Sequence, residues 1–483
     1  MLKERIKSSV ILILIVNLIF LTAHLWFVDS DNSVGADFVQ HLRSHPVVQR
    51  FFPLEAEYSI SKENLSKPRK FLINDGSLWM AYYNTDIGFS PIDERTQEII
   101  KGFLSGDVTA AKQIDYATWE AGLESLSIYV EYPVGFSTDM FCRIMGVDTE
   151  NLPEGITSLR ELVILPSSDE SDVCILVRDF EDNSLIYAYI LEDKYNLPAT
   201  DLSVYTNSDG YYEPAFSTGL VLQEESNVSL APLVLFSDSL PMTEVLAPHN
   251  LINNNSKKAL LENFSFNPNT INTYVDEDGV ENYIANYASL MLHPDSYFEY
   301  TAVSDERGIL LDESSDPYNV LNASIDFAES TWQCVSSEPL SILVTSDLSS
   351  YDSQEEYTIK FDYYCNGRPV EIKLPAQNGH EEMTSAIEIT VKSGRIISYR
   401  QYLRFYNTVS SYELSDTFVT ALDSFVNNIT ATAEAPATVN DIYIGYLDDG
   451  GNEHIYATWL AKTSDGEIYR YTKESEVAED EMD

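Results

Sequence analysis

A run of apolar residues near the start of the chain constrains its architecture more than any other feature. Between Val10 and Val28 the polar side chains are those of Asn17, Thr22 and His24. As a helix this run would rise about 28 Å, close to the hydrocarbon thickness of a bilayer. The apolar region of a secretory signal is shorter, about 7–15 residues, and ends in small residues at a cleavage site. We therefore expect residues 10–28 to form an uncleaved transmembrane anchor.

The residues that flank this run predict its orientation. Three basic residues precede it and are the topology determinants: Lys3, Arg5 and Lys7. Lys and Arg accumulate on the cytoplasmic side of a span, and aromatic rings settle at the membrane interface. Trp26 and Phe27 suit the outer interface. We expect a single-pass membrane protein, with residues 1–9 as a short cytoplasmic leader and the chain after about residue 29 outside the cell.

Two polar residues inside the expected span allow two interpretations. Asn17 and His24 are seven residues apart, so they share one face of a helix. Polar groups in lipid often meet a partner helix, which suggests a lateral contact with the span of another membrane protein. In the other interpretation, one Asn and a His near the interface are simply tolerated.

The charge balance excludes several classes of partner. The chain has 77 acidic and 29 basic residues and a net charge of −48. Nucleic acids and anionic lipid surfaces are bound through clustered Lys and Arg, so we expect no nucleic-acid partner. Two acidic loops, Asp276–Gly279 and Asp448–Glu453, lack the ligand spacing of an EF-hand and resemble turns. The four cysteines show no C-x-x-C spacing, which removes the usual zinc and redox signatures, and we expect no cofactor. The exterior permits disulfides, but a chain of this size with a packed core does not need them, so we expect buried free thiols.

The sequence offers no recognisable catalytic constellation. It lacks the G-x-S-x-G, phosphate-loop and G-x-G-x-x-G motifs. His41 and His45 form H-x-x-x-H, but Leu42 stands where a zincin needs glutamate. A pair of carboxylates could hydrolyse glycosides, and the many acids leave that alternative open. We predict that the protein is not an enzyme.

Local patterns in the exterior region predict an α+β fold of antiparallel sheets, with helices packed on one face. We expect an α+β domain, a mostly β domain, a C-terminal α+β region of one or two subdomains, and an acidic tail. These parts are residues 29–150, 151–252, 253–473 and 474–483. The segment NNNSKK at Asn253–Lys258 marks the boundary before the third part.

Single motifs predict some of the helices and hairpins. One helix should start at Ser90-Pro91 and stop at Gly106. Another should be capped by Ser415 and bury three apolar residues: Phe418, Leu422 and Phe425. Hairpin turns are expected at an Asp-Gly pair, an Asn-Gly pair and a single Gly: Asp278-Gly279, Asn366-Gly367 and Gly394. The chain should close with a meander of three strands: IYIGYL, HIYATWLAK and EIYRYT.

Four passages, taken in their order along the chain, resemble the YycH family. The first is the opening ERIKSSVILILIVNLIFLTAHLW, which is similar to the family's basic leader and single span. The second is LSIYVEYPVGFSTDMFCRI, which resembles the strand-then-helix passage of the first exterior domain. The third is LENFSFNPNTINTYVDEDGVENYI, similar to a Phe/Asn element before a Tyr-rich hairpin. The last, IYIGYL…HIYATWLAKTSDGEIYRY, is similar to the end of the YycH and YycI folds, although Ala457-Thr458 replace a frequent Pro-Ala.

The resemblance implies a function that the residues alone would not. YycH-like proteins are membrane-anchored regulators of the WalK (YycG) sensor histidine kinase in Gram-positive bacteria, whose two-component system governs cell-wall metabolism. The resemblance implies a contact with the kinase through the membrane helix, and with a YycI-like protein through the exterior domains. It implies no catalysis, and family members differ in whether they activate or restrain the kinase. Two other classes stay open, an anchored binding or chaperone protein for cell-wall components and a wall hydrolase.

Overall fold

The structure is a computed structural model that describes residues 60–471 except for a set of internal stretches. Those stretches are 84–88, 167–171, 193, 196, 199–201, 203, 207–213, 217–227, 232–233, 237–240, 249–251, 314–315, 350–354, 377–380, 414–416 and 433–435. The expected anchor at residues 10–28 and the expected tail at 474–483 lie outside the described residues. No helix in the described part of the chain combines the length and the hydropathy that a membrane span requires.

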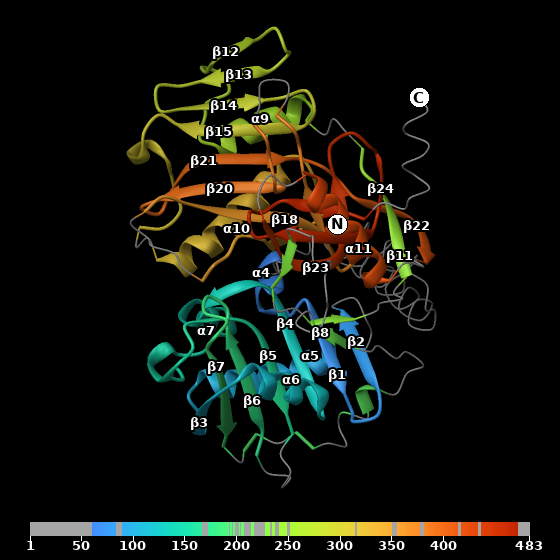
Figure 1. The fold of residues 1–483 in the computed structure, drawn as a ribbon. Helices are drawn as coiled ribbons and strands as arrows, with labels where there is room; N and C mark the ends of the chain where they lie inside the picture. Colours follow the sequence, from blue (N-terminus) through green and yellow to red (C-terminus); the bar gives the residue numbers. More distant parts are fainter. Residues whose placement is uncertain are drawn as a thin grey trace, which may run out of the picture. The chain divides into compact units, whose positions relative to one another are not determined.

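Seven strands from the first half of the chain form one antiparallel sheet (Figure 1, blue to green). Their spatial order is β2 (Trp79–Tyr83), β1 (Lys70–Asn74), β4 (Ser127–Ser137), β5 (Ser158–Leu165), β6 (Cys174–Asp179), β7 (Ile186–Leu191) and β3 (Val108–Ile114). We call it the N-terminal sheet. Strand β4 lies before residue 150 and pairs directly with β5 after it, so the sheet continues across the boundary expected there.

Helices cover both faces of the N-terminal sheet. Three of them pack on it: α5 (Phe89–Leu104), α6 (Tyr116–Glu124) and α7 (Thr138–Met145). Phe71 and Ile73 share an apolar core with α5 and α7, whereas Leu72 shares a second core with Trp119 and Leu123 of α6. Successive side chains of a strand point to opposite faces of a sheet. The expectation that helices pack on one face is therefore wrong for this sheet.

Helix α5 has the buried face that its sequence predicts. Four apolar residues at the spacing of one helical face are buried: Ile92, Ile99, Ile100 and Phe103. Pro91 lies in the first turn, where its missing N–H does not interrupt the helix. The helix ends at Leu104, and Gly106 follows with a φ of 79°. Glycine adopts this left-handed conformation without a steric penalty, which explains the stop.

The buried face of α5 also carries an acid, Asp93, which leads to a prediction of pH-dependent stability. Asp93 accepts a hydrogen bond from Gln97 Nε2 at 3.0 Å, and burial raises its pKa to about 6. Because this pKa lies above the usual 3.8, ionisation of Asp93 opposes folding, and the penalty grows as the pH rises through that window. Asp93→Asn should raise the free energy of unfolding near pH 8 by at most about 3 kcal/mol. Urea unfolding near pH 8 and near pH 4 tests this, and an equal gain at both would contradict it.

Fourteen described strands form the larger sheet (Figure 1, mostly yellow to red). Eleven of them follow one another in the order β12 (Asn272–Val275), β13 (Glu281–Ile284), β14 (Ala288–Leu292), β15 (Tyr297–Ala302), β21 (Arg395–Tyr402), β20 (Ile387–Lys392), β18 (Tyr357–Cys365), β19 (Arg368–Ile372), β23 (Ala437–Asp448), β25 (Thr458–Thr463) and β26 (Ile468–Arg470). Three more join at the side: β9 (Val228–Leu230), β16 (Ile309–Leu310) and β17 (Ile342–Val344). Its helices are α9 (Asn254–Asn263), α10 (Pro317–Gln333) and α11 (Phe418–Thr432). The described fold is α+β with mainly antiparallel sheets, as the sequence predicts.

The hairpins of the larger sheet turn where the sequence predicts. Asn366 and Gly367 have φ values of 52° and 71°, and Ser393 and Gly394 have 49° and 69°. Two successive positive φ angles are typical of the type I′ turn, whose twist matches that of the flanking strands. The turn between β12 and β13 contains Gly279 at a φ of 82°. These hairpins follow from local turn chemistry.

Helices α9 and α11 bear on two predictions, the boundary at NNNSKK and the helix capped by Ser415. The segment NNNSKK, expected as a boundary, forms the start of α9, because Asn253 Oδ1 accepts the backbone N–H groups of Asn255 and Ser256 at 2.9 and 3.1 Å. Helix α11 buries Phe418, Leu422 and Phe425 as predicted. Its expected cap, Ser415, lies outside the described residues.

The closing meander is interrupted in the middle. The stretch HIYATWLAK forms two strands instead of one, β24 (His454–Tyr456) and β25. Strand β25 pairs with β23, whereas β24 pairs with β11 (Pro241–Leu246) in a small sheet completed by β22 (Asn407–Glu413). The predicted three-strand meander is confirmed for β23, β25 and β26, but its middle strand is shorter than expected, because the chain changes partners at Ala457. A further two-stranded sheet joins β8 (Pro214–Phe216) to β10 (Val234–Phe236).

A fully buried ion pair fixes this C-terminal region. Arg404 Nη1 lies 2.6 Å from Asp448 Oδ1, and neither side chain has any exposed surface. Arg404 also donates from Nε and Nη2 to the carbonyl oxygen of Ala247 at 3.0 and 2.7 Å. Tyr406 donates to Asp448 Oδ2 at 2.8 Å. The pair thereby links the end of β23 to the chain that follows β11.

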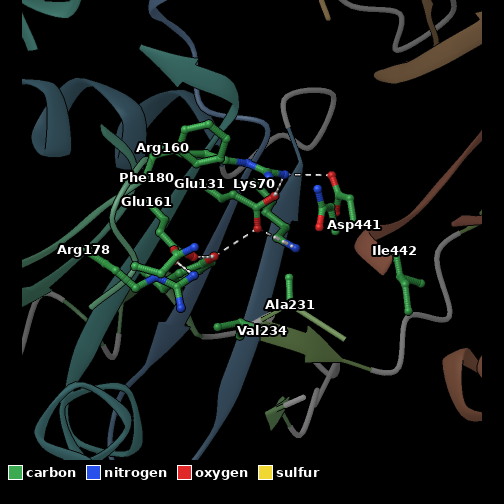
Figure 2. Close-up of a pocket in the computed structure, with 13 residues that line it drawn as sticks. Lys70, Glu131, Arg160, Glu161, Arg178, Phe180, Ala231, Val234, Asp441 and Ile442 are labelled. Carbon is green, nitrogen blue, oxygen red and sulfur yellow. Dashed lines mark hydrogen bonds and ion pairs between the residues drawn. The ribbon is translucent and has the colours of Figure 1, made fainter. Parts of the chain in front are cut away.

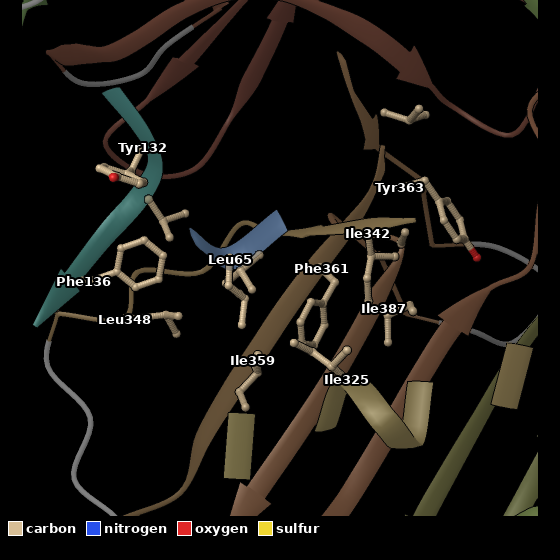
Figure 3. Packing of buried hydrophobic residues seen from close by; sticks show 14 of the residues in the cluster. Leu65, Tyr132, Phe136, Ile325, Ile342, Leu348, Ile359, Phe361, Tyr363 and Ile387 are labelled. Carbon is tan, nitrogen blue, oxygen red and sulfur yellow. The ribbon is translucent and has the colours of Figure 1, made fainter. Parts of the chain in front are cut away.

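A continuous apolar core joins the two sheets around helix α4 (Ile60–Ser66). Leu65 packs in one cluster with Phe136 of β4 and with Ile342 and Phe361 of the larger sheet, as Figure 3 shows. Polar contacts hold the same helix in place. Asn64 Nδ2 donates to the carbonyl oxygen of Ile342 at 3.2 Å. Residues 60–66 are therefore an integral part of the larger core.

Candidate functional site

A group of charged side chains lies where the N-terminal sheet meets strand β23. We call it the charge cluster, and its members are Arg69, Lys70, Glu131, Arg160 and Asp441. Arg69 immediately precedes β1, and Lys70 is its first residue. Glu131 and Arg160 come from β4 and β5, and Asp441 comes from β23. The pairing register of β1 and β4 sets Lys70 opposite Glu131. Two neighbouring strands thus bring opposite charges together at one end of the sheet.

Asp441 is the centre of the contacts between the two sheets. Arg69 binds it with both terminal nitrogens, Nη1 to Oδ2 at 2.8 Å and Nη2 to Oδ1 at 3.1 Å. Arg160 Nη2 lies 2.7 Å from Asp441 Oδ2. A two-pronged contact between a guanidinium and a carboxylate fixes geometry as well as charge. One carboxylate of β23 is therefore held by two arginines of the N-terminal sheet.

Glu131 completes the cluster on the side of the N-terminal sheet. Arg69 also pairs with Glu131, and Lys70 Nζ lies 2.9 Å from Glu131 Oε2. The Tyr129 hydroxyl lies 3.0 Å from the same oxygen and 2.6 Å from Glu161 Oε2, and it can donate its one proton to either of them. Each carboxylate of the cluster thus has more than one positive or hydrogen-bonding partner.

The environment keeps both acids of the cluster ionised. Burial alone would raise the pKa of Glu131, but Arg69, Lys70 and Arg160 outweigh it and lower that pKa to about 2. For Asp441, burial is likewise outweighed by Arg69 and Arg160, so its pKa lies below the usual value. A general acid or base works best with a pKa near the working pH. These carboxylates are therefore suited to holding cations and not to transferring protons.

A cavity of about 180 Å³ lies beside the charge cluster. Figure 2 shows its charged wall, with Glu131, Arg160 and Asp441, facing Ala231 and Val234 across the opening. A buried water needs roughly 10–15 Å³ of such space, so the cavity has room for several waters or a small molecule. It is smaller than the roughly 300–1,000 Å³ typical of pockets that enclose drug-sized ligands.

None of the residues that the sequence singled out belongs to this cluster. The residues proposed for partner contact, the membrane interface and topology lie outside the described residues: Asn17, His24, Trp26, Phe27, Lys3, Arg5 and Lys7. A signal for the cluster is present in the strand SIYVEYP, where Glu131 stands in an otherwise apolar and aromatic run. A charge at such a position is seldom buried without a partner. Nothing local to that strand, however, identifies Asp441 as the distant partner.

The described residues also bear on metal binding and on the cysteines. No group of three or more His, Cys, Asp or Glu residues in the described part of the chain is placed to hold a metal ion. The four cysteines are free thiols, as predicted: Cys142, Cys174, Cys334 and Cys365.

Comparison with known proteins gives a fold relative but no sequence relative. No family model and no curated protein matches the sequence. Among solved structures, the crystal structure of YycH from Bacillus subtilis matches with a TM-score of 0.55 and 16% identity. That match covers 85% of this chain and 97% of the YycH chain. An uncharacterized protein from Eubacterium rectale ATCC 33656 has a TM-score of 0.31, 10% identity, and coverage of 52% of this chain and 92% of its own, too weak a likeness for any argument. The first match shows that this chain has a YycH-like fold.

Proposed function

We propose that this chain is a membrane-anchored, extracytoplasmic regulator of a sensor histidine kinase of the WalK (YycG) type. Its exterior domains would bind a YycI-like protein, and its single membrane helix would contact the kinase. The observation that carries the proposal is the YycH-like fold, which extends over nearly the whole of the related structure. The order of the YycH-like passages along the sequence adds support. In this proposal the protein regulates and does not catalyse.

The electrostatics of the charge cluster agree with a role that needs no proton transfer. Glu131 and Asp441 are ionised at neutral pH and are committed to arginine and lysine partners. Such a cluster can set how strand β23 is held against the N-terminal sheet. A regulator needs two arrangements that differ little in free energy, since a change of about 1.4 kcal/mol alters the ratio of their populations tenfold.

A second candidate function is an anchored binding protein for cell-wall components, which the cavity beside the charge cluster favours. Exchanging the membrane segment for an unrelated one separates the two candidates. The regulator should lose its function on that exchange, because its contact with the kinase lies in the membrane. A binding protein should keep its function, because its site lies in the exterior domains.

Crosslinking in native membranes, followed by purification of the full-length protein, tests the proposal directly. We expect a sensor histidine kinase and a second single-span protein of the YycI type to be recovered. Recovery of wall material or wall enzymes without a kinase would overturn the regulator proposal. A wall hydrolase would instead lose a measurable activity when one or two specific carboxylates are replaced.

The polar face of the expected anchor gives a sharper prediction. Replacing Asn17 and His24 together with leucine should weaken association with the kinase. Hydrogen bonds between membrane helices are worth about 0.6–1.7 kcal/mol, so losing one reduces the association constant roughly 3- to 20-fold. Recovery of the kinase after crosslinking is the measurement. Thr22→Leu is the matched control, because Thr22 lies on another face of the helix. Unchanged recovery for the double variant would show that this face does not bind the kinase.

A further inference from the structure

A second cavity, of about 30 Å³, has a charge opposite to that of the whole chain. Among the described residues that line it are three cations, Arg69, Lys70 and Arg368, and no acid. In the complete chain, acids outnumber basic residues by 77 to 29. Three cations around so small a space are therefore an exception to the composition.

The three cations differ in how they are neutralised. Arg69 and Lys70 already pair with the acids of the charge cluster. Arg368 is 7% exposed, and its guanidinium makes no hydrogen bond or ion pair with a described residue. Its guanidinium lies over the ring of Tyr83, 5.5 Å from the ring centre. Arg368 is thus a buried cation whose protein partner is an aromatic face.

Arg404 shows how another buried arginine of this region is neutralised. It follows β21, is 1% exposed, and is surrounded by a carboxylate, a hydroxyl and carbonyl oxygens. Burying a charge without a counter-charge is unfavourable, so buried charges are normally paired. The Asn366-Gly367 turn holds Arg368 at the first position of β19, with its backbone paired to Cys365. Within the described part of the chain, the fold therefore places this arginine at the cavity with no acid beside its guanidinium.

The size and walls of the cavity indicate which anion would fit. A space of about 30 Å³ holds about two water-sized groups, which matches the two oxygens of a carboxylate. A carboxylate also matches the planar fork of a guanidinium. The rings of Tyr83, Tyr443 and Trp459 line the cavity and suit an apolar or aromatic group next to the carboxylate.

The larger cavity offers space for the remainder of the ligand. Lys70, Val234 and Ile442 line both cavities. Figure 2 shows these three side chains at the edge of the larger one. From the charge, the size and the shared wall, we propose that Arg368 binds the carboxylate of a small organic acid. The rest of that acid lies against the aromatic rings and extends toward the larger cavity.

Binding of phenylacetate, compared with its uncharged analogue phenylacetamide, tests this proposal in the full-length protein. A ligand that binds only the folded state stabilises it by RT ln(1 + [L]/Kd), so the midpoint of thermal unfolding keeps rising with the free ligand concentration. We expect phenylacetate to raise the midpoint with this logarithmic dependence on its concentration and phenylacetamide to leave it unchanged. Equal responses to both, or a response to inorganic phosphate alone, would overturn carboxylate recognition.

The variant Arg368→Gln separates a binding role from a structural one. Because no described acid pairs with this cation, removing it should leave the midpoint without ligand unchanged or higher. Affinity for phenylacetate should fall by about tenfold or more, since a charge-assisted contact is lost. Arg395→Gln is the control, because Arg395 lies in the larger sheet outside the cavity and should keep the response. Full retention of binding in Arg368→Gln would refute the assignment. If that variant failed to fold, the comparison of the two ligands in the unaltered protein would still decide.

A free acid and the end of a peptide chain present the same carboxylate. A short peptide that ends in phenylalanine, compared with its C-terminal amide, distinguishes these sources. Tighter binding of the free-ended peptide than of phenylacetate identifies a chain end as the natural ligand, and weaker binding identifies a free acid. Binding of the acid does not depend on kinase regulation, because the ligand response and the recovery of the kinase are separate measurements.

Discussion

Replacing Asp441 with asparagine is expected to lower the free energy of unfolding by about 3–5 kcal/mol. The substitution removes the carboxylate that Arg69 and Arg160 share, and it leaves two arginines of the N-terminal sheet with Glu131. The loss of one partner from a buried ionic group leaves charge that neither protein nor water neutralises well. Urea unfolding of the full-length protein at neutral pH measures the difference.

A neighbouring acid and a second substitution serve as controls for Asp441→Asn. Asp449 is exposed, so Asp449→Asn should change the free energy of unfolding by less than about 0.5 kcal/mol. Adding Arg160→Met to Asp441→Asn should recover part of the loss, because one uncompensated arginine disappears. A double variant as unstable as the sum of the single variants would contradict a direct ionic contact.

The same contact should depend on pH in a defined direction. The pKa of Glu131 falls from 4.5 to about 2 in the folded protein, and that of Asp441 also falls. Groups with a lowered pKa stabilise the folded state above their unfolded pKa, and this contribution disappears as the pH falls through the folded pKa. The difference between the unaltered protein and Asp441→Asn should therefore shrink from about pH 5 toward pH 2. A constant difference over this range would show that the loss is one of packing.

Replacing Arg404 with methionine is expected to have an effect of similar size, about 3–5 kcal/mol. The variant leaves Asp448 buried without its cation and the carbonyl oxygen of Ala247 without two donors. Burial already raises the pKa of Asp448, although Arg404 acts in the opposite direction. Without Arg404 we expect the Asp448 carboxyl to take up a proton, which limits the decrease in the free energy of unfolding.

Hydrogen exchange and a conservative variant make the Arg404 prediction specific. Amide protons of β11 and β24 should exchange faster in Arg404→Met. Arg404 holds Ala247, which directly follows β11, and β11 in turn pairs with β24. Arg404→Lys keeps the charge but not the planar fork, so its stability should lie between those of the unaltered protein and Arg404→Met. Unchanged exchange in β11 would show that Arg404 is not what holds that strand.

Elements set by local chemistry could be predicted from the sequence, and those set by distant partners could not. The turn at Asn366-Gly367 and the end of α5 before Gly106 depend on a few adjacent residues. The charge cluster depends on Arg69 meeting Asp441, and these residues are 372 positions apart. In the sequence, β24 and β25 look like one continuous strand. They separate in the structure because β24 pairs with the distant strand β11.

The placement of the helices and of the smaller cavity also depends on distant partners and could not be predicted from local sequence. Helix α6 packs on the face opposite α5 because successive side chains of β1 point both ways, and both faces of the sheet are apolar. The turn before Arg368 was predictable, but its burial is not. That burial requires Tyr83 from the N-terminal sheet and Trp459 from near the end of the chain.

The parallel pairing of β9 with β23 has a consequence for the order in which the chain folds. Ser229 of β9 meets Thr438 of β23, and 209 positions separate them. In helix α4, Ser61 likewise donates a hydrogen bond to the carbonyl oxygen of Leu340, which lies 279 positions further along the chain. Contacts between distant segments slow folding, because a long loop must close before they form. During synthesis the N-terminal sheet can form as soon as β7 is made, while β9 and β11 wait with unpaired edges. Such edges pair readily with other chains, so we expect the interval before β23 emerges to be the time of greatest risk of aggregation.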